Sequence, residues 1–110
     1  MPSKPVSLIN SPDLSPMELS EEQLALVEEY AAAFLTFREI AVLLGVNVYH
    51  FLEMMKDKDS PAYYRYFLGK TRAKFEIRKN IVDMAKKGSP QAEELTLSLM
   101  QDAEFEELDI

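Results

Sequence analysis

Residues 36–57 carry the stretch TFREIAVLLGVNVYHFLEMMKD, which predicts two short helices joined by a tight turn. Gly45 stands where such a turn needs a residue that tolerates positive φ. Ala41, four residues earlier, is small enough to let the second helix approach the first. The apolar residues that would pack the two helices together are Ile40, Leu44, Val46, Phe51 and Met54.

This pattern resembles the helix-turn-helix motif in its glycine, its small residue and its apolar positions. In that motif the second helix enters the major groove, so double-stranded DNA is the first partner to consider. The alternatives are a generic helical corner, or a helix-turn-helix used only for packing or protein contact. The candidate DNA-binding residues are Arg38, Asn47, Tyr49, His50, Lys56 and Lys58.

The predicted recognition helix is poor in groups that read bases. Asn47 suits adenine, and Tyr49 suits a phosphate or a thymine methyl group. The helix offers no arginine for guanine, and Glu53 would repel the DNA backbone unless it reads cytosine. We therefore expect weak binding through one copy and loose sequence selectivity.

The composition points away from catalysis. The chain has one histidine and no cysteine, and it shows no glycine-rich phosphate loop or metal-ligand spacing. We therefore expect a non-enzymatic protein without cofactor or metal, and we interpret His50 as a surface or DNA-facing residue. The lack of cysteine fits a cytoplasmic setting, and no apolar run reaches the length of a membrane span.

Capping residues, prolines and glycines divide the chain. Residues 1–19 hold four prolines and predict an extended arm. A first helix is expected to run to about Phe34, with Leu24, Val27, Ala31 and Phe34 as its buried stripe. Helices are expected to begin after Ser20, Thr36, Asn47, Ser60 and Ser89.

The fourth predicted helix is unusually long, from residue 61 to 87, where Gly88 stops it. Gly69 weakens this helix, so a bend or break there is one possible outcome. The short link to the next helix, which should end near Met100 or Ala103, predicts an antiparallel hairpin. We therefore expect an all-α fold with an arm (1–19), a helix-turn-helix head (20–59), a hairpin (60–103) and an acidic tail (104–110).

Charge is segregated along the chain, whose net charge is −7. Residues 1–64 carry 4 basic and 10 acidic groups. Residues 65–87 carry 8 basic and 2 acidic groups, and residues 88–110 carry 0 basic and 7 acidic groups. A basic segment can bind phosphate, whereas an acidic tail more often docks to proteins or aids solubility. The basic groups Arg65, Arg72, Lys79 and Lys86 recur every seven residues and predict one stripe.

The long helix also carries an apolar arc wider than one partner helix covers, which favours packing between subunits. Its basic groups would then meet either DNA or the acidic tail of a neighbour. The alternative is an ordinary amphipathic helix with a solvated basic face. The candidate oligomerisation residues are Tyr64, Phe67, Leu68, Phe75, Ile81 and Val82.

The order of features resembles the small terminase subunits of tailed bacteriophages. The similarity covers roughly residues 20–103, and the motifs that carry it are EIA at 39–41, LGV at 44–46, YFLG at 66–69 and the segment 85–92. It implies a non-catalytic packaging protein that acts in the bacterial host cytoplasm and forms a homo-oligomeric ring. Residues 37–56 would bind viral DNA and residues 61–103 would form the oligomerisation core.

The resemblance also implies a second partner, the large terminase subunit, which holds the ATPase and nuclease. The acidic end from residue 102 to 110 would dock to it through Phe105, Leu108 and Ile110. Two other interpretations stay open: a dimeric helix-turn-helix transcription regulator, and a helical adaptor protein without a nucleic-acid role.

Overall fold

The structure is a computed structural model that describes residues 18–108, except for the side chains of residues 105, 107 and 108. Within this part of the chain there are five helices and no strand, so the all-α prediction is confirmed. Most of the predicted N-terminal arm and the last two residues lie outside it. The helices are α2 (Glu21–Ala32), α3 (Phe37–Leu44), α4 (Val48–Lys56), α5 (Pro61–Lys86) and α6 (Pro90–Leu108).

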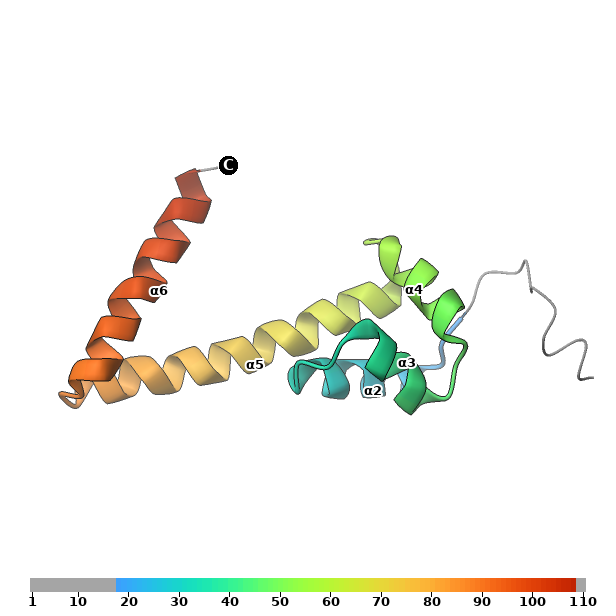
Figure 1. Cartoon of the computed structure of the whole chain (residues 1–110), viewed down its shortest axis with the longest axis horizontal. Coiled ribbons are helices and arrows are strands. Elements are labelled where there is room, and N and C mark those ends of the chain that lie inside the picture. The colour runs from blue at the N-terminus through green and yellow to red at the C-terminus, as the bar shows by residue number, and fades with distance from the viewer. Residues whose placement is uncertain (1–17, 109–110) are drawn as a thin grey trace, which may run out of the picture.

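The helices form an elongated molecule with extents of 67 × 29 × 19 Å. Figure 1 shows α2, α3 and α4 gathered around the N-terminal half of α5. The C-terminal half of α5 extends away from this group, and α6 turns back from its far end at a wide angle. The α6 helix runs past the predicted end at Met100 or Ala103, so residues 104–108 are helical.

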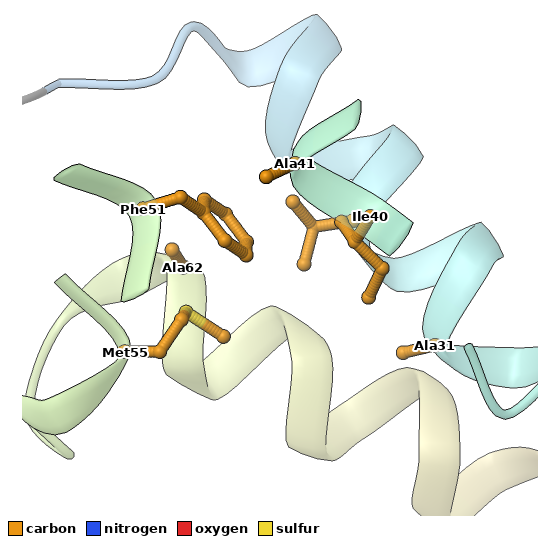
Figure 2. Close-up of a cluster of buried hydrophobic side chains, with 7 residues drawn as sticks. Ala31, Ile40, Ala41, Phe51, Met55 and Ala62 are labelled. Carbon is orange, nitrogen blue, oxygen red and sulfur yellow. The ribbon is translucent and has the colours of Figure 1, made fainter. Parts of the chain in front are cut away.

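The core lies where the first four helices meet (Figure 2). Ile40 and Phe51 are fully buried, as the spacing of the apolar residues predicted. Leu44, Val46 and Met54 are partly buried and pack against this cluster. The buried residues of the core are Val27, Ala31, Ile40, Ala41, Phe51, Met55 and Ala62.

Each of the first four helices begins at the predicted cap. The Ser20 hydroxyl accepts a hydrogen bond from the backbone N–H of Gln23 at 3.1 Å, and the Gln23 side chain accepts one from Ser20 N–H at 2.9 Å. Thr36 and Glu39 form the same reciprocal box. These contacts join residues only three apart, so sequence alone identifies them. Asn47 and Ser60 cap α4 and α5 with single bonds.

Three helices end in the same way, with a left-handed residue followed by a residue whose N–H reaches back five positions. Gly45 (φ 74°) and Gly88 (φ 96°) end α3 and α5 in this manner. At the end of α2 the left-handed residue is Phe34, with φ 63°. Its side chain is 48% exposed. The prediction that Phe34 continues the helix and its buried stripe is therefore wrong, because the chain has already turned left-handed there.

The α5 helix is continuous through Gly69, and at this glycine the backbone of α2 approaches α5 closely. A Cβ atom at position 69 would lie 2.1 Å from the carbonyl oxygen of Glu28, deep inside van der Waals contact. Gly69 is thus required by packing between helices rather than by a bend. Glycine has a low helix propensity, but its lack of a Cβ atom allows the two backbones to meet here.

Ion pairs hold the same contact on both sides of Gly69. Arg65 donates from Nε to Glu28 Oε1 at 2.8 Å and from Nη1 to Glu21 Oε2 at 2.7 Å. Arg72 donates to the second oxygen of Glu28 at 2.8 Å. The hydrogen bonds with Glu21 and Glu28 raise the pKa of Arg65 above its ordinary value. Glu28 is therefore clamped between two guanidinium groups, one turn before and one turn after Gly69.

The Gly69→Ala variant should lose stability although alanine is the better helix former. The propensity gain is about 1 kcal/mol, but overpacking against a backbone carbonyl costs roughly 1–3 kcal/mol and the carbonyl has no rotamer to yield. Because a backbone carbonyl cannot move aside, we expect the upper end of this cost, and therefore a net loss of about 2 kcal/mol in the free energy of urea unfolding. Thr71→Ala, at an exposed position two residues on, is the control; equal stability in both variants would contradict the close approach.

The Phe34→Gly variant should gain stability. A left-handed conformation costs a residue with a Cβ about 1–2 kcal/mol, while the half-exposed ring loses only part of its apolar contact on removal. We expect the urea midpoint to rise by the equivalent of about 1 kcal/mol. Ala33→Gly, at φ −93°, should lower the midpoint instead. A lower midpoint for Phe34→Gly would show that the ring contributes more than its backbone strain costs.

Candidate nucleic-acid interface

The α3 and α4 helices are joined by a three-residue turn, residues 45–47. Gly45 adopts φ 74° and ψ 24°, and the N–H of Val46 donates to the carbonyl of Ala41 at 3.2 Å. Ala41 is fully buried at the base of this turn. The residues singled out in the sequence thus form the turn and the packing that they predicted.

The outward face of α4 consists of residues at i, i+4 and i+7. Tyr49 is 67% exposed, and the side chains of Glu53 and Lys56 are also exposed. His50 is half-buried, with its ring centroid 5.9 Å from that of Tyr49. The opposite face of the helix carries Phe51 and Met55, which are buried in the core. A ligand that contacts this outward face, such as DNA, would therefore meet Tyr49, Glu53 and Lys56 first.

Asn47 already has a structural role that competes with base reading. Its Oδ1 accepts a hydrogen bond from the backbone N–H of His50 at 2.9 Å and caps α4. A bidentate contact with adenine needs the same oxygen as an acceptor. The oxygen has a second lone pair, but the cap fixes the orientation of the side chain. Reading adenine through Asn47 would therefore compete with the cap, whose removal costs about 1 kcal/mol.

Glu53 and Lys56 neutralise each other on the outward face. Lys56 Nζ lies 2.8 Å from Glu53 Oε2. This hydrogen bond, helped by the charge of Glu53, raises the pKa of Lys56. The ammonium stays protonated at neutral pH, but its attraction for a phosphate is offset by the carboxylate beside it.

The other two candidate DNA contacts lie apart from this face. Arg38 is on α3, where it lines a shallow apolar depression with Leu35, Val42 and Leu43. Val42 is 64% exposed, a feature that the sequence analysis did not use. Lys58 follows α4, and its Nζ sits 5.9 Å from the centroid of the Tyr63 ring. The structure therefore brings together Asn47, Tyr49, His50 and Lys56 on one helix and leaves Arg38 on another.

The predicted basic stripe on α5 divides into two parts. Arg65 and Arg72 are held by the carboxylates of α2, as described above. Lys79 and Lys86 are exposed and take part in none of the ion pairs found between residues 18 and 108. The seven-residue spacing alone could not show this division, because the carboxylate partners come from a distant part of the sequence.

The candidate oligomerisation residues are largely on the surface. Tyr64 is 61% exposed, Phe67 55% and Phe75 60%, while Leu68, Ile81 and Val82 are half-buried. The α6 helix adds exposed apolar residues that the sequence analysis did not single out, namely Leu95, Leu97 and Met100. The side chains of Phe105 and Leu108, and all of Ile110, lie outside the described part of the chain, so the docking tail stays a prediction.

Between residues 18 and 108, no group of three or more His, Asp or Glu side chains is placed to hold a metal ion. None of the described helices combines the length and apolar character that crossing a bilayer requires. Comparison with protein-family models, with curated proteins and with solved structures finds no match to this chain.

If the outward face of α4 contacts double-stranded DNA, the Glu53→Gln variant should bind that DNA more tightly. The change removes a negative charge and frees Lys56 to contact a phosphate. We expect roughly three- to tenfold tighter binding at low salt, and a slope of log K against log salt that is steeper by about 0.9. Fluorescence anisotropy across a salt series measures both quantities.

The matched control is Glu29→Gln, which makes the same change in charge at an exposed position of α2. An equal gain in the two variants would mean that only net charge matters, and that the outward face of α4 does not lie on the DNA.

Proposed function

We propose that this protein is a non-enzymatic component that binds double-stranded DNA through α3 and α4 and acts as a homo-oligomer. The observation that carries the proposal is the pair of helices around Gly45. Its inner faces are buried in the core, whereas the outer face of α4 presents Tyr49 and Lys56 to solvent. This division of faces is what a helix-turn-helix head needs to enter a major groove.

Self-association is the second part of the proposal. The far half of α5 and the part of α6 up to Met100 leave large apolar side chains uncovered, among them Phe75, Leu95 and Met100. Large apolar side chains exposed in this number favour an interaction site on these helices. An oligomer would also make up for a weakly binding head, because linked sites raise avidity by orders of magnitude.

The resemblance to small terminase subunits supports a more specific role. In this proposal the heads recognise viral DNA and the helical hairpin of α5 and α6 assembles the oligomer as a ring. The acidic C-terminal end then recruits the large terminase subunit, which supplies the ATPase and nuclease. The two tasks would be separated along the chain, with DNA near the N-terminal end of α5 and the partner protein at the C-terminal end of α6.

One observation favours the adaptor alternative. Residues 20–59 carry 3 basic and 8 acidic groups, and one of the three cations, Lys56, is paired with Glu53. A head with this balance repels a polyanion unless the cations are concentrated at the contact. The adaptor would use its apolar and acidic surfaces for protein contacts only.

Two charge-reversal variants test the proposal. Lys56→Glu/Lys58→Glu alters the head, and Lys79→Glu/Lys86→Glu makes the same change in charge on α5. We expect the head variant to bind double-stranded DNA at least about tenfold more weakly at low salt, with little change in the α5 variant. The reverse order would move the DNA contact to α5. Absence of salt-dependent binding by the wild type would remove the DNA role and favour the adaptor.

A further inference from the structure

The α5 and α6 helices meet only near the turn that joins them. Ala92 is buried there, and Ile81 and Ala85 are half-buried. Beyond this point the two helices diverge (Figure 1), and Ile77 and Leu95 are each about half exposed. The facing surfaces of the two helices are therefore mostly uncovered.

These uncovered surfaces match each other in register. On α5, Lys70, Lys74, Ile77 and Ile81 fall at i, i+4, i+7 and i+11 and so share one face. On α6, Leu95, Leu99, Asp102 and Glu106 have the same spacing and also share one face.

Counted outward from Gly88, the two sets coincide position by position. Ile81 and Leu95 both lie seven residues from it, and Ile77 and Leu99 both lie 11 residues from it. Lys74 and Asp102 lie 14 residues away, and Lys70 and Glu106 lie 18. Antiparallel pairing of α5 with α6 would place apolar groups opposite each other near the turn and opposite charges together farther out.

The chain does not make the charged contacts of this register within itself. The ion pairs found in residues 18–108 lie within α4 and between α2 and α5, and none joins α5 to α6. Lys70 instead turns back along its own helix, with Nζ 3.4 Å from Tyr66 Oη and 5.5 Å from the centroid of that ring. Asp102 and Glu106 are exposed.

We propose that α6 of one copy lies antiparallel on α5 of a second copy in this register. The inference rests on the homo-oligomer in the proposed function and names the contact that builds it. The second copy is the occupant that the observations favour, because a chain whose α6 points away from its own α5 has both complementary faces available at once. Reciprocal exchange of α6 would close a dimer, and exchange in one direction around a circle would close a ring.

Two reversed variants isolate this contact. The first, Lys70→Glu/Lys74→Glu, makes the α5 face acidic, and the second, Asp102→Lys/Glu106→Lys, makes the α6 face basic. Each variant alone would oppose like charges, so we expect each to lose the native mass of the wild type at moderate salt. An equimolar mixture would again oppose unlike charges between copies, so we expect it to recover that mass. Light scattering or native mass spectrometry measures the result.

Controls keep the experiment interpretable. The variant Lys79→Glu/Lys86→Glu makes the same change in charge on the opposite side of α5 and should keep the wild-type mass. Circular dichroism of each variant establishes that its helices are formed.

Other outcomes would overturn the inference. If the mixture fails to assemble while all four substitutions in one chain restore the wild-type mass, α6 closes on its own α5. If both reversed variants keep the wild-type mass, the register is not an interface. A monomeric wild type would overturn both this inference and the proposed homo-oligomer. If the wild type is oligomeric but α6 closes on its own α5, or both reversed variants keep the wild-type mass, only this inference is overturned.

Discussion

The contact of α2 with α5 at Gly69 is the constraint on which the rest of the structure depends. Without a Cβ at this position, the backbone of Glu28 lies directly on α5. Arg65 and Arg72 then hold the side chain of the same glutamate from both directions along the helix. Because α2 is fixed in this way, its buried residues provide a surface on which α3 packs, and α4 packs in turn on α3 and on α5. The orientation of α4, and therefore of its outward face, rests on α3 and α5, and the contact at Gly69 fixes these two helices relative to each other through α2.

The parts of this fold that sequence could predict are those set by neighbours along the chain. Thr36 caps a helix through a residue three positions away, and Gly45 ends one by its own backbone conformation. The ion pairs of Glu28 join it to arginines that lie 37 and 44 positions away in the sequence. Sequence alone could not predict them, because arginines spaced by seven residues give the same pattern whether they face solvent or carboxylates. The prediction that Phe34 is buried was wrong for a related reason. An aromatic residue favours burial, but the position after α2 requires a left-handed conformation.

The candidate site shows the same limit for function. Residue type correctly placed Tyr49 and Lys56 on an exposed helix face. It could not show that the side-chain oxygen of Asn47 caps α4. It also could not show that Glu53 forms an ion pair with Lys56. Each of these side chains would have to exchange a contact within the protein for one with DNA. Such exchanges lower the net gain from each head, which is why the proposed function relies on several copies.

The distribution of cations on α5 explains how assembly and another binding event could coexist on one helix. Arg65 and Arg72 are committed to α2. Lys70 and Lys74 lie on the face whose register matches the acids of α6, whereas Lys79 and Lys86 lie on the opposite side. A helix with one continuous basic face would force its oligomer contact and a polyanionic ligand to compete for the same charges. Placing Lys79 and Lys86 on a different face from Lys70 and Lys74 avoids that competition, so contacts between copies would leave Lys79 and Lys86 accessible on the assembled protein.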